Sequence, residues 1–182
     1  MTVPRFRLYL AQSIDGCIAD ERGGVDWLTA YGEPEGYAQF LAETGAIVMG
    51  RRSFDQMLEF GPWPYGERRT VVMTRRALPE SAPAAAEAWR GEDVRSLADD
   101  LRARTRGDVW LFGGGSAMRP FIAADLVDTI EIAIIPVVLG AGIRLFEPEG
   151  PTRRFDLRSV GHAAAGYALL TMVRRQANAA RD

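Results

Sequence analysis

Lysine is absent from this sequence of 182 residues, and cysteine and histidine each occur once, as Cys17 and His162. All 22 basic residues are therefore arginines, whose planar guanidinium groups bind phosphate and carboxylate through paired hydrogen bonds. A single cysteine excludes a disulfide within the chain and a metal cluster held by thiolates, so we expect a reducing, cytoplasmic location. The sequence has no signal-peptide core at its start and no run of about 18 apolar residues, so we expect neither export nor membrane insertion.

The remaining composition is that of an ordinary globular protein, with 47% hydrophobic and 25% charged residues. A net charge of −2 gives no general attraction to nucleic acid or to an anionic membrane, and we expect neither as a partner. The length fits one domain, which we place at residues 1–175, followed by a flexible tail at 176–182. We expect Cys17 to pack in the interior and His162 to lie on the surface.

Strand and helix patterns alternate along the first three quarters of the chain. Strands are predicted at residues 6–11, 46–49, 70–73, 109–112 and 129–135. Helices are predicted at residues 33–44, from 51 onward, at 94–101 and from 116 to 128. Such alternation predicts an α/β fold with a mainly parallel central sheet and helices on both faces. Strands at 155–160 and 167–173 are close enough to form an antiparallel pair, which adds an antiparallel C-terminal strand to that sheet.

Three segments of the chain give more specific predictions of local structure. Residues 77–91 are rich in alanine and proline, so we expect a surface excursion there. Pro120 should lie in or near the first turn of its helix, where a missing N–H costs least. Glu33 and Glu35 fall where the first turn of the 33–44 helix favours acidic side chains.

A strand followed by Gly113, Gly114, Gly115 and Ser116 is the segment around which the chain is organised. Glycines let the backbone approach a bulky group, and the first amides of the following helix are free to bind an anion. The spacing is neither the G-x-G-x-x-G of a Rossmann unit nor a P-loop. A tight turn that merely needs glycine is the alternative interpretation.

Two further strands end at junctions of the same kind. The first joins a strand to a helix through Gly50, Arg51, Arg52 and Ser53, and the second follows a strand with Thr74 and Arg75. Guanidinium groups beside hydroxyls at a helix N-terminus favour an anion site, although solvated surface charge is the alternative. In open α/β sheets, ligands bind outside the carboxyl ends of the strands, which is where all three junctions fall.

Together these segments resemble the dihydrofolate reductase superfamily, and within it the reductase (C-terminal) domain of the riboflavin-biosynthesis enzyme RibD. The matching segments are Ser13-x-Asp15-Gly16-x-Ile18-Ala19, Met49-Gly50-Arg51-Arg52-Ser53-Phe54, Val71-Val72-Met73-Thr74-Arg75, Leu111-Phe112-Gly113-Gly114-Gly115-Ser116, Leu126-Val127-Asp128 and Pro136-Val137-Val138-Leu139-Gly140. The resemblance implies a dihydrofolate reductase-like fold and NADPH as cofactor. It places the two arginine junctions around the adenosine end and its phosphates, and the glycine triplet under the pyrophosphate.

The resemblance also implies a substrate side. Dihydrofolate reductases use one carboxylic acid, shortly after a loop tryptophan, to support protonation of the pterin. Glu33 lies six residues past Trp27 and is the nearest match, with Glu35 second. Hydride would pass to a small heterocycle, pyrimidinone- or pterin-like, beside Ser13, Asp15 and Trp27.

Two other expectations concern assembly and rival functions. RibD-like reductase domains commonly form homodimers, and the apolar run at residues 168–173 favours a partner chain near the last strands and the 136–142 loop. A nucleotide-binding or dimerisation module of the same fold, without turnover, is the alternative to an enzyme. An NAD-dependent Rossmann dehydrogenase is disfavoured because its glycine fingerprint is missing.

Overall fold

The protein is described here by a computed structural model, which defines residues 3–146 and 150–175. Its strands are β1 (Phe6–Ser13), β2 (Cys17–Ala19), β3 (Thr44–Gly50), β4 (Arg69–Met73), β5 (Ala86–Trp89), β6 (Asp108–Gly113), β7 (Thr129–Ile135), β8 (Ile143–Arg144), β9 (Phe155–His162) and β10 (Ala168–Arg174). Its α-helices are α1 (Tyr37–Glu43), α2 (Arg51–Glu59), α3 (Val94–Arg104) and α4 (Gly115–Ala123), and a 3-10 helix spans Asp26–Tyr31.

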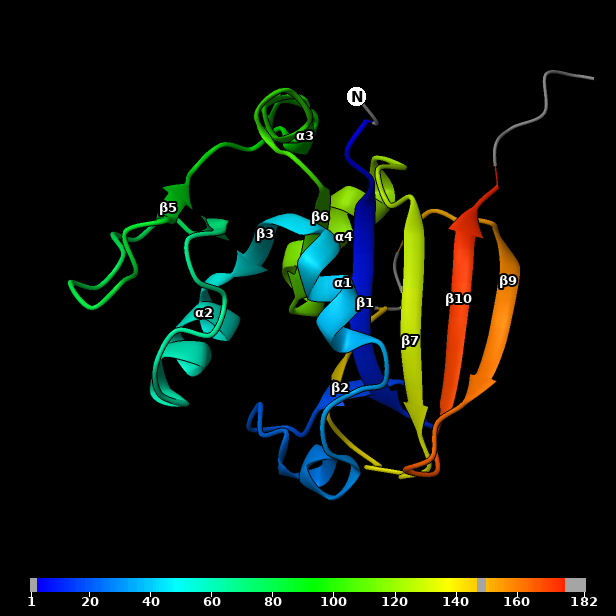
Figure 1. The fold of residues 1–182 in the computed structure, drawn as a ribbon. Helices are drawn as coiled ribbons and strands as arrows, with labels where there is room; N and C mark the ends of the chain where they lie inside the picture. Colours follow the sequence, from blue (N-terminus) through cyan, green and yellow to red (C-terminus); the bar gives the residue numbers. More distant parts are fainter. Residues whose placement is uncertain (1–2, 147–149, 176–182) are drawn as a thin grey trace, which may run out of the picture.

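Eight of these strands form one sheet in the order β5-β4-β3-β6-β1-β7-β10-β9 (Figure 1). The pairs from β5 to β7 are parallel, whereas β10 is antiparallel to both β7 and β9. Strands β2 and β8 form a separate antiparallel pair. Strand β10 therefore runs opposite to the other seven strands of this sheet, which confirms the prediction of a mainly parallel sheet with an antiparallel C-terminal strand.

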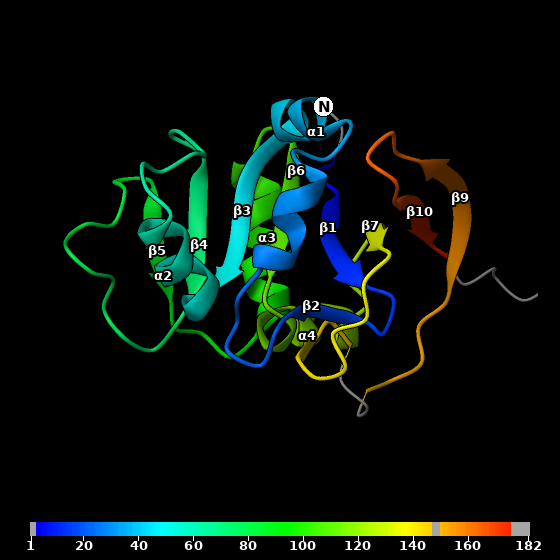
Figure 2. The same cartoon turned by 90° about the horizontal axis from the view of Figure 1, so that it is seen from below.

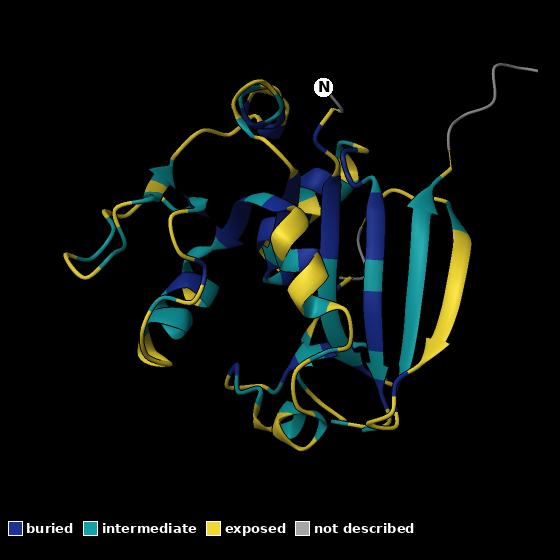
Figure 3. Cartoon of the chain, viewed as in Figure 1, coloured by how far each residue is buried: buried dark blue, intermediate teal, exposed yellow. Residues whose placement is uncertain are grey.

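Both faces of the sheet carry helices, as the strand–helix alternation predicted. On one face Phe6 and Leu8 of β1 are fully buried in a cluster that includes residues of α3 and α4, and Phe6 packs against Phe121 of α4. On the other face the ring of Tyr9 stacks on Phe40 of α1 at 4.1 Å. Burial is deepest in β3, β6 and β7 and falls across β10 to β9, the outermost strand (Figure 3). The helices therefore cover the parallel part of the sheet and leave its C-terminal edge more exposed.

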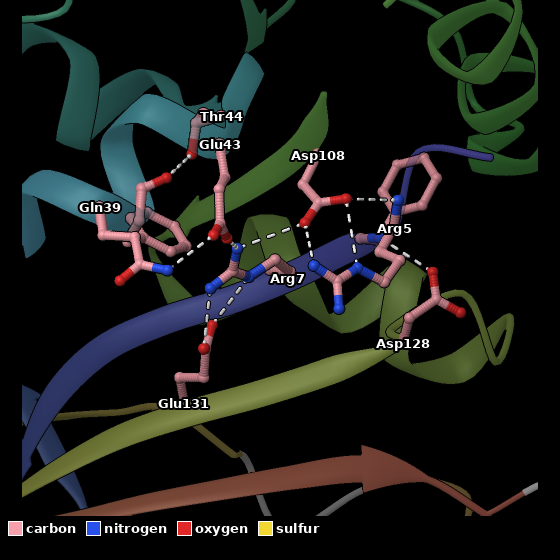
Figure 4. A network of polar contacts seen from close by, with 10 residues as sticks. Arg5, Arg7, Gln39, Glu43, Thr44, Asp108, Asp128 and Glu131 are labelled. Atoms are coloured by element: carbon pink, nitrogen blue, oxygen red, sulfur yellow. Dashed lines mark hydrogen bonds and ion pairs between the residues drawn. The ribbon is translucent and has the colours of Figure 1, made fainter. Parts of the chain in front are cut away.

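Arg7 of β1 is buried although the sequence alternation places it on the polar side of the strand (Figure 4). Its guanidinium group lies under α1, 4.5 Å from the ring centre of Phe40, and forms ion pairs with three carboxylates. The nitrogen–oxygen distances are 2.6 Å to Glu43, 2.8 Å to Glu131 and 3.3 Å to Asp108. A buried guanidinium is tolerated here because its charge is matched on several sides.

Three local predictions were wrong. Residues 77–91 are not only a surface excursion, because Ala86–Trp89 forms the edge strand β5, parallel to β4. Pro120 lies in the second turn of α4, since that helix begins at Gly115. Helix α1 begins at Tyr37 after the left-handed Gly36, so Glu33 and Glu35 precede the helix and are not first-turn acids. Each error concerns a boundary set by tertiary contacts or by a glycine.

Candidate active site

A cleft of about 770 Å³ opens at the carboxyl ends of β1, β3, β4 and β6. Figure 2 views the molecule from this end, where β1 leads toward β2. The described residues that line it are Leu10, Ala11, Ile18, Ala19, Gly23, Val25, Leu28, Gly50, Arg51, Arg52, Ser53, Gln56, Met73, Phe112, Gly113, Gly114, Gly115, Ser116, Ala117 and Ile143. The cleft therefore joins an apolar wall to the glycine triplet and to the first of the two arginine junctions.

The glycine triplet at the end of β6 has a separate structural reason at each position. Gly113 has a φ of +127°, which L side chains rarely adopt, and the peptide bond to Gly114 is cis. A Cβ atom on Gly115 would lie 2.6 Å from the carbonyl oxygen of Arg144, so that position is closed by backbone. A Cβ atom on Gly114 would meet only the Ser53 hydroxyl, at 3.8 Å. A Cβ atom on Gly113 would meet nothing within 4 Å, so Gly114, with a φ of −75°, is the member of the triplet that combines free space with a backbone that other residues can adopt.

The junction at residues 50–53 lies beside the glycine triplet because β3 and β6 are neighbours in the sheet. Met49 pairs with Gly113, so β3 and β6 end together, and α2 and α4 begin there at Arg51 and Gly115. A Cβ atom on Gly50 would lie 3.1 Å from the Cβ atom of Ala117, which shows how closely the two junctions pack. The first amides of each helix lack intrahelical acceptors. Two helix N-termini therefore present free N–H groups and positive dipole ends to one cleft.

The two arginines at the start of α2 are held by contacts within the chain. Arg51 donates to the Asp55 carboxylate at 2.7 Å and to the carbonyl oxygen of Ala77 at 2.8 Å. Arg52 donates to the carbonyl oxygen of Arg22 in the preceding loop. Both guanidinium groups therefore have acceptors within the chain, and both residues line the cleft.

The loop at residues 20–24 forms one wall of the cleft and is fastened from both sides. The Asp20 carboxylate accepts hydrogen bonds from the amides of Arg22 and Gly24, both at 2.8 Å. The Gln56 side chain, one turn after Ser53 on α2, donates to the carbonyl oxygen of Gly23 at 2.8 Å. Gln56 is not among the site residues predicted from the sequence, although its position three residues after Ser53 places both side chains on one helix face.

The junction at Thr74 and Arg75 lies outside this cleft. Met73 lines the cleft, but Thr74 and Arg75 do not. The Arg75 side chain is 86% exposed and lies 3.3 Å from the Glu92 carboxylate, while the Thr74 hydroxyl accepts from the Arg76 amide at 3.1 Å. The structure therefore brings together eight of the ten predicted cofactor-binding residues, and leaves Thr74 and Arg75 at the edge of the sheet.

Asp15 is engaged with the loop that follows β7. Its carboxylate accepts hydrogen bonds from the Ser13 hydroxyl at 2.6 Å and from the amides of Leu139 and Gly140 at 3.2 and 2.9 Å. These bonds, that from Ser13 first, hold the pKa of Asp15 below its ordinary value. Asp15 does not line the cleft, and its carboxylate ties the turn after β1 to the 137–142 loop.

Trp27 and Glu33 also lie away from the lining of the cleft. Trp27 packs against the cluster formed by Ala133, Ile135 and Tyr167, while its neighbour Leu28 does line the cleft. Glu33 is exposed on the segment before α1. The Glu35 carboxylate accepts from the amide of Ala164 at 2.7 Å and so serves the turn between β9 and β10.

The chemistry of the lining differs from the prediction for the substrate side. Among the residues of the cleft that the structure describes there is no aspartate, glutamate, histidine, tyrosine or cysteine. Its charged members are Arg51 and Arg52. In the described ranges no group of three or more histidine, cysteine or acidic residues is placed to hold a metal ion, and no helix is long and apolar enough to cross a membrane. The cleft therefore suits an anionic ligand bound beside an apolar one.

Comparison with known proteins agrees with this architecture. Residues 4–169 match the family model of the RibD C-terminal domain. The protein YwjB of Bacillus subtilis (strain 168), itself described as uncharacterized, is 33% identical over 165 residues, which are 89% of this chain and 92% of YwjB.

Two solved structures show the same fold. A Shewanella sp. PV-4 protein whose name links it to riboflavin biosynthesis is 27% identical, with a TM-score of 0.84 over 94% of this chain and 99% of its own. Dihydrofolate reductase from Enterococcus faecalis, solved with NADP(H), is 19% identical, with a TM-score of 0.68 over 94% of this chain and 97% of its own. This chain therefore belongs to the RibD C-terminal domain family and has the fold of dihydrofolate reductase.

Proposed function

We propose that this protein is an NADPH-dependent reductase that transfers hydride to a small heterocyclic substrate. Its family includes NADPH-dependent reductases. The observation that carries the proposal is the pair of helix N-termini, those of α2 and α4, which open side by side into one cleft. Such termini favour a diphosphate, because free amides and helix dipoles act on its charge together.

The residues present fit this cofactor. The space at Gly114, bounded by the Ser53 hydroxyl at 3.8 Å from a Cβ position, allows a pyrophosphate to approach the backbone. Arg51 and Arg52 supply two guanidinium groups at the rim, and charge-assisted hydrogen bonds from arginine suit the 2′-phosphate that distinguishes NADPH from NADH. The volume of about 770 Å³ falls within the range of ligand pockets.

The apolar wall of the cleft has a separate task in this proposal. NADPH, when bound, supplies the hydride, while the protein supplies binding, orientation and the surrounding electrostatics. Leu10, Ile18 and Leu28 line the cleft on the side of β1 and the first loops. A flat heterocycle would be held against these side chains, which exclude water from the reacting carbon.

The absence of a carboxylate from the described lining bears on the substrate class. A pterin imine is the kind of acceptor that a nearby carboxylic acid helps to protonate. Glu33 is exposed, and the carboxylates of Asp15 and Glu35 accept hydrogen bonds from other parts of the chain. A pyrimidinone-like substrate, with solvent as the source of the proton, therefore fits this cleft better than dihydrofolate does.

The direct test is the loss of NADPH absorbance with an aminopyrimidinone or with dihydrofolate as substrate. We expect substrate-dependent oxidation with the pyrimidinone and none above background with dihydrofolate. NADPH binding without oxidation by either compound would instead favour a binding module of the same fold. Oxidation by dihydrofolate alone would contradict the assignment of the substrate class.

We further propose that the protein acts as a homodimer. On the outer strands, Val160 pairs with Leu170 and Leu157 with Met172, so the four side chains share one sheet face. Leu157 is 59% and Val160 64% exposed, and Val138 in the 137–142 loop is 67% exposed. An apolar face that is only partly covered, next to the edge of the sheet, favours association. One chain has a mass of 20.0 kDa, and light scattering at micromolar concentration should give about twice that mass. The mass of a single chain would contradict the dimer.

A further inference from the structure

A second cavity, of about 700 Å³, lies at the opposite end of the sheet from the candidate active site. It forms where β1, β7 and β9 begin and where β10 ends. Its walls carry four arginines, Arg5, Arg158, Arg174 and Arg175, and two aspartates, Asp128 and Asp156. The wall therefore carries a net positive charge, and no residue of it belongs to the cleft described above.

Three of the four guanidinium groups are held by carboxylates. Arg5 donates to Asp108 at 2.6 Å, a pair visible in Figure 4. Arg174 donates to Asp128 at 2.8 Å, and Arg175 donates to Asp156 at 2.7 Å. These pairs fix the shape of the wall before any ligand arrives.

Arg158 is the exception. Within the described ranges its guanidinium group makes no hydrogen bond and no ion pair, although it lines the cavity. It is also the extra residue of a β-bulge, because Thr171 pairs with Ser159 and Met172 pairs with Leu157. A bulge places one more residue on its strand than on the partner and so redirects that side chain.

A further donor in the wall lacks an acceptor. The Nε atom of Arg174 is enclosed by protein and has no hydrogen-bond partner in the part of the chain that the structure describes. Buried donors are nearly always satisfied in native proteins. Because the Nε atom of Arg174 is enclosed, it does not face the cavity, and the exposed Arg158 is the group in the wall that remains open to a ligand.

We propose that this cavity binds a small polar anion, with a phosphate or carboxylate group held by Arg158. A guanidinium group donates two parallel hydrogen bonds to either kind of oxyanion. The cavity volume suits a metabolite-sized molecule, and the paired arginines around it would donate to its polar substituents while the aspartates would accept from them. The site is separate from the cleft, so it does not depend on the function proposed above.

The test uses nuclear magnetic resonance of the full chain, titrated with inorganic phosphate and, separately, with succinate. The reporters are the backbone amides of Thr129 and Val173, which line this cavity and not the cleft. We expect saturable shifts of these amides with one or both anions. Saturation by phosphate identifies a phosphorylated ligand class, and saturation by succinate a carboxylate class.

Substitution then assigns the effect to one side chain. Arg158→Gln should weaken anion binding about tenfold or more, because a charge-assisted pair is lost. Arg154→Gln removes the same charge from a residue that is exposed as Arg158 is, but that does not line the cavity, and should leave binding unchanged. The proposal is overturned if neither anion shifts the reporters at about 10 mM, an affinity below that of weak metabolite sites, or if Arg158→Gln and Arg154→Gln behave alike.

Discussion

The guanidinium group of Arg52 packs against the Cα atom of Gly23, and it donates a hydrogen bond to the carbonyl oxygen of Arg22. A Cβ atom at position 23 would lie 2.5 Å from Nη2 of Arg52, and the φ of Gly23 is +89°. Glycine at this position therefore lets an arginine at the start of α2 fasten the loop that walls the candidate active site.

This relationship predicts the effect of Gly23→Ala. A left-handed backbone at an alanine destabilises the folded protein by about 1–2 kcal/mol, and the added methyl group also displaces Arg52. We expect faster amide hydrogen exchange at Arg22 and Gly24 than in the natural protein. Gly32→Ala is the matched control, because Gly32 has a φ of +65° but no atom within 4 Å of its Cβ position. Equal exchange in the two variants would show that Arg52 does not hold the loop.

The glycine triplet gives a paired prediction. Gly114→Val fills the space toward Ser53, so it should abolish NADPH binding while circular dichroism shows a folded protein. Gly115→Val places its side chain against the backbone carbonyls of Arg144 and Leu145, so it should lower the melting temperature. Retained NADPH binding in Gly114→Val would mean that this glycine serves only the turn.

The ion pairs of Arg7 predict a large effect on stability. Its side chain is 8% exposed, and removing one partner of a buried ion pair leaves uncompensated charges that cost about 3–5 kcal/mol. Arg7→Ala should lower the free energy of unfolding in urea by that amount. Arg104→Ala breaks a pair in which the arginine is 73% exposed and should change it by about 0–1 kcal/mol. Similar losses in both variants would contradict the role given to Arg7.

Asp15 predicts a pH dependence. Hydrogen bonds from Ser13, Leu139 and Gly140 hold its pKa below the ordinary value in the folded protein. Its contribution is therefore present above the unfolded pKa and is lost as the pH falls through the lower folded pKa. The amides of Leu139 and Gly140 should become less protected from exchange as the pH is lowered through that range. In Asp15→Asn their protection should be weak and independent of pH. Unchanged protection in Asp15→Asn would show that other contacts hold the loop.

The positions of the parallel strands along the chain and the location of the cleft at their carboxyl ends were predictable from the sequence, because both follow from local patterns. Short apolar runs mark the buried parallel strands, and glycines at their ends mark where backbone meets a helix N-terminus. The spatial order of the strands was not predicted, and it is the structure that pairs Met49 with Gly113 and so brings Gly50 and Gly114 together. The resemblance to the RibD C-terminal domain family rests on these same segments, and membership of that family is confirmed.

Features set by distant contacts were not predictable in this way. Arg7 alternates with apolar residues, a pattern that predicts exposure to solvent. In the structure it is buried and forms ion pairs with Glu43, Asp108 and Glu131, which come from three separate elements. The segment of β5 has little pattern of its own and becomes a strand through its pairing with β4.

The substrate side was the least predictable part of the site. Helix α1 begins only after the left-handed Gly36, so Glu33 and Glu35 precede the helix and do not lie in its first turn as the sequence pattern predicted. A carboxylate also cannot be distinguished from sequence as a catalytic group or as an acceptor for backbone amides. Asp15 shows this, since its three hydrogen bonds all come from within the chain.

The central claim is that the cleft between α2 and α4 binds NADPH through their N-termini and the arginines at its rim. Isothermal titration calorimetry with NADPH and with NADH tests it most directly. One NADPH per chain should bind, and more tightly than NADH, since each charge-assisted hydrogen bond to the 2′-phosphate contributes about 1.5–3 kcal/mol. Arg51→Ala should weaken NADPH about tenfold and hardly affect NADH. Equal affinities for the two cofactors, or no binding of either, would contradict the account.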